Sequence, residues 1–393
     1  MFGKFNRLTN TGNLRDMMKG GAWMMQLMAG MALGKDAPAM VSCDWQAEKA
    51  EILERADWLC EHVIVQPKAL IKSMPNILGE RFGGEWAIYS CTHLQAALLN
   101  ISRLYPDEKE RCLERMERVI PIVMSDEVAN YDTIPWKEKA LDTLDGNKSH
   151  MTYLSLLAWV ISNYRLAGGA NTQWDDLFKR LCETLHRRMT RRQDLCLPSF
   201  PDGIVFLPDM MFTIISLDNY GKLFDDRYAA VVAQWLAKAK SEWIHRHTGL
   251  LVATLGRREI RGSYTALSTY CLTLLDEEFA REQYQRMKAS LLQKKTVKGI
   301  HVEGIKEFLR YSPKFKFDYD AGPIVEGFSP SGTAWAIGAA TYFQDGEFRG
   351  QMLRTADLFG RTTSAGGNRH YKLGELVIVG EAVTLAMRTH AKQ

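Results

Sequence analysis

The sequence lacks paired cysteines. Its 393 residues include seven cysteines, an odd number, and no two of them form a Cys-x-x-Cys pair. That absence excludes zinc-ribbon and thioredoxin-like sites. Most of the seven lie in apolar helical patterns typical of buried thiols, which favours a reducing compartment. We therefore expect a cytoplasmic protein, with export as the alternative if residues 1–39 are a signal peptide.

The sequence also has little excess charge of one sign. Lys and Arg total 50 and Asp and Glu total 46, so the net charge is +4, which is too small to indicate a nucleic-acid partner. The 12 prolines and 30 glycines follow no short period, which excludes collagen-like and disordered chains. With 46% hydrophobic residues, the composition is that of a globular protein with a full core, and the expected partner is a small-molecule substrate.

No long hydrophobic run is present. The apolar, Met-rich stretch 22–33 has twelve residues, too few to span a bilayer, so we expect no stable membrane span. We expect residues 1–45 to form an N-terminal extension whose helix packs on the body, with an interfacial membrane contact as the alternative. Residues 46–393 are expected to form a single catalytic domain, and homo-oligomerisation stays open.

Several catalytic signatures are missing. The chain has no His-Glu-x-x-His motif, no P-loop, no dinucleotide-binding glycine pattern and no Gly-x-Ser-x-Gly elbow. Each of these motifs carries a specific mechanism, based on a metal, a nucleotide or a serine nucleophile. We therefore expect no cofactor and no metal site.

Two kinds of helical segment alternate along the chain. Segments of the first kind carry an apolar stripe with charged residues between, typical of amphipathic helices. They span residues 47–64, 107–124, 174–189, 227–244, 279–292 and 347–359. Segments of the second kind are apolar nearly all round, typical of buried helices. They begin near Glu85, His150, Asp209, Gly262, Ser329 and Gly374.

Six buried helices alternating with six amphipathic ones predict an all-α fold, an (α/α)6 toroid of six helical hairpins. Short extended pieces at 203–207 and 249–254 are expected as loop hairpins. A helical solenoid is the alternative, because it uses the same hairpin unit. A solenoid does not need six fully apolar helices, nor a connection as long as 125–149, so the toroid is favoured.

In such a toroid the inner helices begin at one mouth, where their free N–H groups and positive partial charge favour carboxylates. We therefore expect the functional site just before and at the start of these helices. The candidate catalytic residues there are His150, Asp209, Tyr264 and Asp320. The candidate substrate-binding residues are Asp132, Trp136, Glu138, Tyr153, Arg261, Glu326 and Trp335.

Purely structural roles remain open for several of these residues. Asp209 is of a type that caps helices, and His150 is equally consistent with a hydrogen-bonded core histidine. Asp318 and Asp320 are two positions apart in a segment interrupted by Gly and Pro. If that segment is extended, both carboxylates face one side and one of them holds its proton to higher pH. The alternative is that they form ion pairs with Arg261 or Arg310.

The stretch 131–292 resembles the linalool dehydratase-isomerase family. The similar segments are YDTIP, then KSH before an apolar helix, DNYGKLFDDRY, SYTALSTYCLTLLD and FAREQYQRM. The resemblance implies an (α/α)6 barrel and places the family's active-site histidine on His150 and its tyrosine on Tyr264. The family's two cysteines fall on Phe200 and Asp209, while Cys196 is out of register.

Together these patterns predict a cofactor-independent lyase or isomerase that acts on a largely apolar, terpenoid-like molecule. Asp209 or Asp320 is the expected acid, since a carboxyl against aromatic walls loses solvation and donates a proton near neutral pH. His150 is the expected base or relay and Tyr264 a proton donor. The alternatives are a carbohydrate-active enzyme with paired carboxylates and a non-catalytic binding scaffold.

Overall fold

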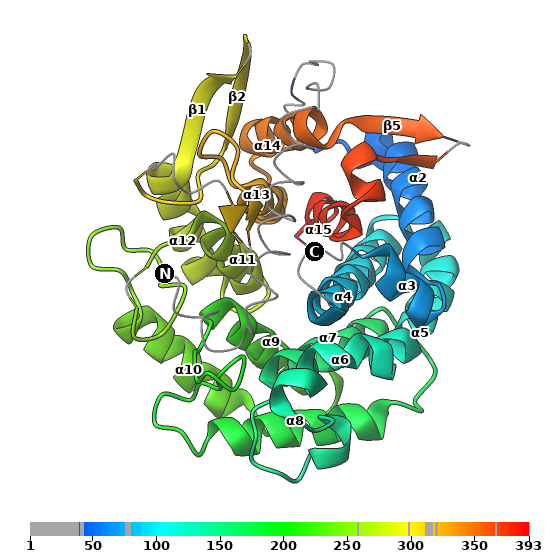
Figure 1. Ribbon diagram of the computed structural model, residues 1–393, viewed down its shortest axis with the longest axis vertical. Helices are drawn as coiled ribbons and strands as arrows, with labels where there is room; N and C mark the ends of the chain where they lie inside the picture. Colours follow the sequence, from blue (N-terminus) through cyan, green and yellow to red (C-terminus); the bar gives the residue numbers. More distant parts are fainter. Residues whose placement is uncertain are drawn as a thin grey trace.

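The computed structural model describes residues 39, 43–74, 80–257, 259–297, 299–310, 317–318, 321–365 and 368–392. Over these ranges the chain is mostly helical, with a few short strands (Figure 1). The expected N-terminal helix within residues 1–45 lies outside the described residues.

Six helices surround the middle of the molecule. They are α4 (Glu80–Leu104), α7 (Met151–Leu166), α9 (Leu207–Leu223), α11 (Gly262–Thr273), α13 (Pro330–Tyr342) and α15 (Ile378–Arg388). Each packs against the next in this order, and α15 packs back against α4 (Figure 1). These are the six segments predicted as buried helices, and in α7, α9, α11 and α13 nearly every residue is buried. Their lack of a polar stripe follows from having neighbours on all sides.

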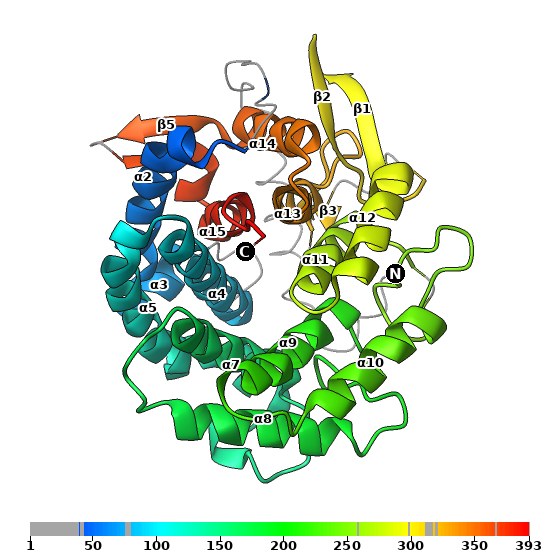
Figure 2. The same ribbon diagram turned by 180° about the vertical axis from the view of Figure 1, so that it is seen from behind.

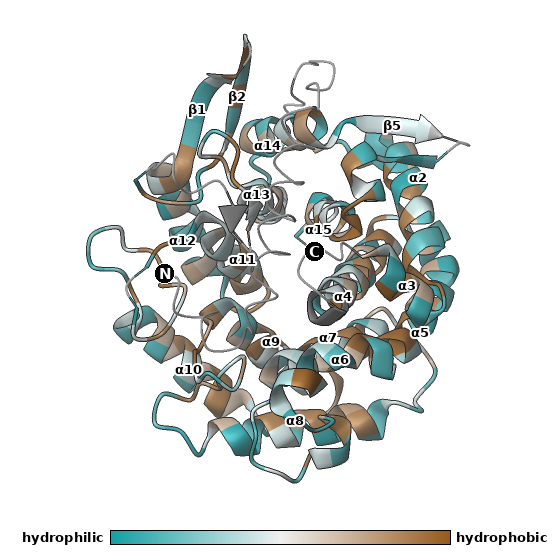
Figure 3. Cartoon of the chain, in the orientation of Figure 1, coloured by the Kyte–Doolittle hydropathy of each residue, from teal (hydrophilic) through white to brown (hydrophobic). Residues whose placement is uncertain are grey.

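Six further helices lie outside these. They are α2 (Trp45–Val63), α5 (Lys109–Met124), α8 (Asp175–Met189), α10 (Ala229–Glu242), α12 (Glu277–Leu291) and α14 (Gly346–Gly360). Helices α5, α8, α10, α12 and α14 each pack on the preceding helix of the first set, and α2 packs on α15. Their polar faces point outward (Figure 3). The six predicted amphipathic segments are thus confirmed as helices, with boundaries within a few residues.

Aspartate caps fix several of these helix starts. Asp44 accepts hydrogen bonds from the backbone N–H groups of Gln46 and Ala47 at the start of α2. Asp276 and Asp345 cap α12 and α14 in the same manner. An N-cap carboxylate satisfies N–H groups that have no partner within the helix, and so specifies where the helix begins.

Two helices were not anticipated. Helix α3 (Pro67–Ser73) follows α2, and α6 (Asp126–Trp136) occupies the connection expected to be a long loop. Three short 3-10 turns, η1 (Pro106–Glu108), η2 (Leu141–Thr143) and η3 (Lys372–Glu375), lie in other connections. Pro135 inside α6 obscures its helical pattern in the sequence, because proline is strongly disfavoured within helices.

The strands form three antiparallel pairs. Antiparallel β1 (Leu292–Val297) and β2 (Ile300–Ile305) project from the end of α12 (Figure 2). Two shorter pairs are β3 (Phe317–Asp318) with β4 (Gly322–Pro323), and β5 (Thr362–Ala365) with β6 (Asn368–Tyr371). The β3–β4 pair lies next to the central helices (Figure 2). The expected hairpins at 203–207 and 249–254 are present only as isolated bridges, such as Phe206 with Thr254. Among the described residues no helix is both long and apolar enough to cross a membrane.

Candidate active site

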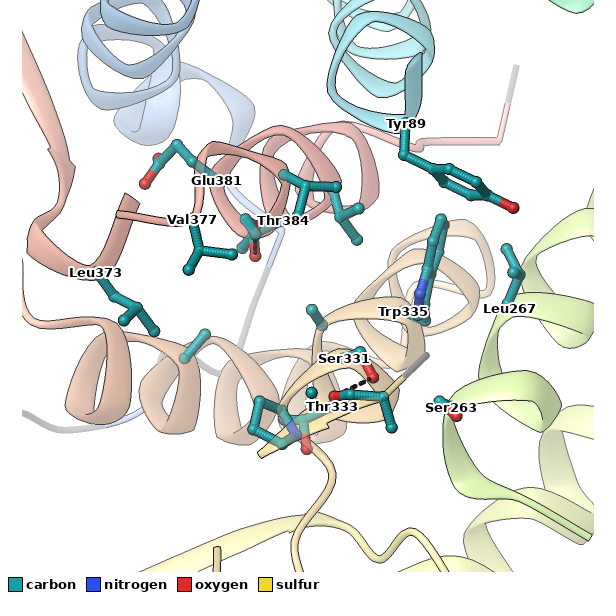
Figure 4. Close-up of a pocket in the computed structure, with 18 of the residues that line it drawn as sticks. Tyr89, Ser263, Leu267, Ser331, Thr333, Trp335, Leu373, Val377, Glu381 and Thr384 are labelled. Carbon is teal, nitrogen blue, oxygen red and sulfur yellow. Dashed lines mark hydrogen bonds between the residues drawn. The ribbon is translucent and has the colours of Figure 1, made fainter. Parts of the chain in front are cut away.

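A cavity of about 290 Å³ opens at one end of the six inner helices. Five of these helices, α4, α9, α11, α13 and α15, contribute residues from their first three turns to its wall. Figure 4 shows labelled side chains from four of them, α4, α11, α13 and α15. The segments before α9, α13 and α15 and the second half of α14 complete it. Residues near the starts of five of the six helices that surround the middle of the molecule therefore lie together. The described residues of α7 are not part of the wall.

The cavity wall is predominantly apolar and aromatic. Its aromatic members are Trp86, Tyr89, Phe200, Phe206, Tyr264, Phe328, Trp335, Phe359 and Tyr371. The ring of Tyr89 on α4 and the indole of Trp335 on α13 lie on the same side of the cavity (Figure 4). Such a surface binds the carbon skeleton of a small molecule, and the few polar groups on it fix orientation.

Asp209 is the carboxylate at which hydroxyl groups converge. Its Oδ1 accepts a hydrogen bond from the Tyr89 hydroxyl at 3.4 Å, and its Oδ2 accepts one from Ser199 Oγ at 2.5 Å. It lies in the first turn of α9, just after Pro208. A proline is well tolerated there and a carboxylate is favoured beside the free N–H groups. Asp209 does not cap the helix, because the N-cap residue is Phe206.

Tyr264 and Arg261 lie at the start of α11. Tyr264 is on the cavity wall with its ring centre 5.5 Å from that of Phe206. Arg261 lies beside the Tyr264 ring at 5.3 Å, and its Nε donates to Glu307 Oε1 at 2.6 Å. Ser263 donates to the same oxygen at 2.9 Å. Arg261 is therefore held in a buried ion pair with Glu307 and supports the edge of the cavity; Glu307 was not among the expected partners.

Glu381 is a second carboxylate on the cavity wall. Its Oε1 accepts from Arg55 at 2.7 Å and its Oε2 from the backbone N–H of Tyr371 at 2.6 Å. Arg55 also lies over the Tyr371 ring, 4.2 Å from its centre. Both oxygens are thus engaged by the protein, which marks Glu381 as part of the framework of the cavity.

His150 belongs to a separate buried cluster between α6 and α7. Its Nδ1 lies 2.6 Å from Asp132 Oδ2 and its Nε2 lies 3.2 Å from Glu138 Oε1. Trp136 packs with its ring centre 5.1 Å from the imidazole. A carboxylate oxygen only accepts hydrogen bonds, so the neutral ring serves one carboxylate at a time and the imidazolium serves both. Lys148 pairs with Glu138 at 2.5 Å and lowers the pKa of that carboxyl.

Two neighbouring arginines on α8 anchor the loop that presents His150, and Arg187 donates to the backbone carbonyls of Leu144 and Gly146. The buried guanidinium of Arg188 on α8 donates to the backbone carbonyls of Thr143, Leu144, Gly146 and Ser149. His150 itself has φ 46°, the left-handed region that a non-glycine residue seldom occupies. Burial lowers the pKa of Arg188 to about 10. The anchoring bonds hold the strained residue in place at the start of α7.

The remaining predicted residues are dispersed. Tyr153 is buried and donates to the backbone carbonyl of Val123, pointing toward α5. Glu326 lies on an exposed turn and pairs with Lys295 at 2.5 Å. Trp335 is on the cavity wall. The side chain of Asp318 and all of Asp320 lie outside the described part of the structure.

Sequence reasoning missed several polar groups of the cavity wall. They include Glu85, Tyr89, Ser263, Ser331, Thr333, Glu381 and Thr384. Most follow the start of an inner helix by up to three turns. The sequence does carry a signal for them, because residues on one face of a helix recur every three to four positions. Among the described residues no three His, Cys, Asp or Glu side chains are grouped as metal ligands would be.

The chain matches no model of a known protein family, and no curated protein sequence matches it.

Proposed function

We propose that the six hairpins form an (α/α)6 toroid and that the chain is an enzyme performing acid–base chemistry in the cavity at its mouth. The observation that carries the proposal is Asp209, a carboxyl group flanked by the hydroxyls of Tyr89 and Ser199 in an aromatic cavity. A positioned carboxyl with hydroxyl partners can give a proton to a bound molecule and take one back.

The proposed reaction is a dehydration or the related isomerisation of a largely apolar alcohol. The protonated Asp209 donates to the substrate hydroxyl, the C–O bond breaks and water leaves. The carboxylate so formed removes a proton from the adjacent carbon, which gives the alkene and restores the acid. Positive charge that develops on carbon is stabilised by the faces of aromatic rings such as Trp335 and Tyr264.

Two observations favour this chemistry over glycoside hydrolysis. The cavity wall is mostly apolar, and its volume of about 290 Å³ is near the lower end of small-molecule sites. Glycoside hydrolysis needs two carboxylates, for which the sequence offers Asp132, Glu138, Asp209, Asp320 and Glu326. Asp209 lines the cavity, Asp132 and Glu138 surround His150, Glu326 pairs with Lys295, and Asp320 lies outside the described residues. The resemblance to the linalool dehydratase-isomerase family supports the same reaction class. We assign His150 no direct contact with substrate, because it is not on the described cavity wall.

The decisive experiment compares Asp209→Asn with wild type on a panel of terpenoid alcohols and alkenes, with products followed by gas chromatography. General acid–base catalysis contributes roughly 100-fold to 10,000-fold, so turnover should fall by at least about 100-fold. Asp218→Asn, on the same helix in a surface pair with Lys222, is the matched control and should keep wild-type turnover. Wild-type turnover by Asp209→Asn would overturn the proposal, and activity confined to a parallel panel of oligosaccharides would favour the carbohydrate-active alternative.

A further inference from the structure

The cavity extends beyond the inner helices to the outer layer of the fold. Its wall includes the second half of α14, an outer helix, together with η3 and the first turns of α15. Helices α14 and α15 both pack on α13 and on η3, so these four elements adjoin one another. We call this part of the wall the outer arm, and it consists of Ala356, Phe359, Leu373, Val377, Gly380 and Thr384.

The outer arm and Asp209 lie at opposite ends of the cavity. Figure 4 shows Leu373 and Val377 on the side away from Tyr89, and the hydroxyl of Tyr89 bonds to Asp209. The indole of Trp335 lies on the Tyr89 side as well. A molecule whose hydroxyl group is at Asp209 therefore reaches the outer arm only if the rest of the molecule is extended.

The polar side chains in and beside the outer arm bond to the protein itself. Thr384 Oγ1 donates to the backbone carbonyl of Gly380 at 2.8 Å. Thr355 Oγ1, on the α14 side, donates to the backbone carbonyl of Glu303 at 2.5 Å. Both oxygens of Glu381 are engaged as well, as described above. The outer arm therefore presents mainly hydrocarbon to the cavity, and such a surface favours an apolar chain because binding removes the apolar surface of both from water.

Small residues leave room in the outer arm. Gly380 lies on the cavity wall with part of its surface exposed, and a Cβ placed on it would have nothing within 4 Å. Ala356 on α14 is also on the wall and partly exposed, and its side chain is a single methyl group. A longer side chain at either position would extend into the outer arm. The two positions lie on different helices, so each can shorten the arm independently of the other.

We propose that the outer arm binds the hydrocarbon chain of the substrate, and that Ala356 and Gly380 set the length of the chain that it accepts. This inference rests on the proposed function and narrows its substrate class to alcohols whose apolar part is an elongated chain. With the hydroxyl group at Asp209, the chain passes the start of α13 and its far end lies between α14 and α15. A compact ring system would fill the Asp209 end and leave the outer arm empty.

The test measures binding of straight-chain primary alcohols, from 1-butanol to 1-octanol, to the full chain by isothermal titration calorimetry. Each methylene that leaves water strengthens binding about fourfold, so the affinity of the wild type should rise by about that factor per carbon. Carbon-13 NMR of labelled methyl groups locates the chain. The methyl groups of Leu373 and Val377 should shift with 1-octanol and not with 1-butanol. Those of Leu267, on the Tyr89 side of the cavity (Figure 4), should shift with both alcohols.

Two variants shorten the outer arm. Gly380→Leu and Ala356→Leu each add carbon atoms to its wall, so the affinity should stop rising at a shorter chain than in the wild type. Each should bind 1-octanol at least about tenfold more weakly, because every methylene left in water costs about fourfold. Ala233→Leu is the matched control, since it makes the same change at an exposed position of α10, and it should follow the wild type. The NMR measurement on the wild type decides the question even if neither variant folds.

Three outcomes would overturn the inference. Wild-type affinity of either variant for 1-octanol, or unshifted methyl groups of Leu373 and Val377 in the wild type, means that the chain does not occupy the outer arm, and leaves the chemistry proposed for Asp209 intact. An affinity of the wild type that does not rise with chain length removes the apolar subsite altogether. Failure of the proposed function alone is distinct, because it appears as unchanged turnover in Asp209→Asn while the dependence of binding on chain length persists.

Discussion

Glu48 on α2 and Arg349 on α14, 301 positions apart in the chain, meet as a side-on pair. Arg349 Nη1 lies 2.9 Å from Glu48 Oε1, and Nη2 lies 2.8 Å from Oε2. The Nε of Arg388 on α15 donates to Oε2 as well, at 2.7 Å. All three side chains are buried. One carboxylate therefore joins the first described helix to the last two.

Replacing Glu48 should strongly destabilise the protein. Glu48→Gln leaves the buried guanidinium of Arg349 without its carboxylate, whereas Arg388 keeps its pair with Glu51. Breaking a buried pair in this way costs about 3–5 kcal/mol. Urea unfolding followed by circular dichroism measures the loss. The control is Glu282→Gln, which makes the same change in an exposed pair with Arg286 and should cost less than about 0.5 kcal/mol. Equal losses in the two variants would contradict the assigned role.

The start of α11 tolerates no side chain at position 262. A Cβ on Gly262 would stand 2.1 Å from the backbone oxygen of Lys306, and a backbone atom cannot move aside as a side chain can. Gly262→Ala should therefore lower the free energy of unfolding by more than about 2 kcal/mol, as overpacking does. Gly380→Ala is the opposite case, because nothing lies within 4 Å of its Cβ. That variant should gain about 0.5–1 kcal/mol. Thermal unfolding of both variants checks the contrast.

The helices were predictable from the sequence because their environments differ. Inner helices such as α7 contact protein on every side and are apolar all round. Helix α8 has one side in water, so its apolar residues form a stripe along the other side. Helix α6 was missed, because Pro135 and a mixture of buried and exposed positions give it neither pattern. The β1–β2 hairpin was missed because its strand 292–297 carries lysines and few apolar residues, as an exposed edge does.

The sequence indicated which part of the fold holds the candidate site, but not which residues form it. The starts of the inner helices do come together, which placed Asp209, Tyr264 and Trp335 on one cavity. The sequence could not separate His150 from them, because Asp132 of α6 and Glu138 just after this helix contact the imidazole and form a second cluster. Long-range partners such as Glu307 for Arg261 depend on tertiary packing, for which local spacing gives no signal.

Removing the donors of Arg188, which together with Arg187 anchors the loop before α7, should loosen that loop selectively. Arg188→Met keeps the apolar stem of the side chain but deletes the donors to the carbonyls of residues 143–149. Amide hydrogen exchange in these residues should become at least about tenfold faster, the factor expected for a loss of about 1.4 kcal/mol in local stability. Arg180→Met, on the exposed side of α8, is the control. Unchanged exchange in 143–149 would show that the guanidinium does not hold the loop.

The buried imidazole of His93 should make folding stability depend on pH. Burial lowers its pKa from 6.5 to about 4, so between these values the unfolded chain binds a proton that the folded chain does not. Stability is then complete above about pH 6.5 and falls as the pH is lowered toward 4. Between pH 7.5 and pH 5 the loss from this one group is about 2 kcal/mol. His390, which is also fully buried and whose pKa is lowered to about 3, adds a loss of the same sign. Urea unfolding at the two pH values should therefore show a drop about 2 kcal/mol smaller in His93→Phe than in wild type. The exposed-site variant His62→Phe should follow wild type, and equal drops in all three proteins would mean that His93 is protonated in the folded state.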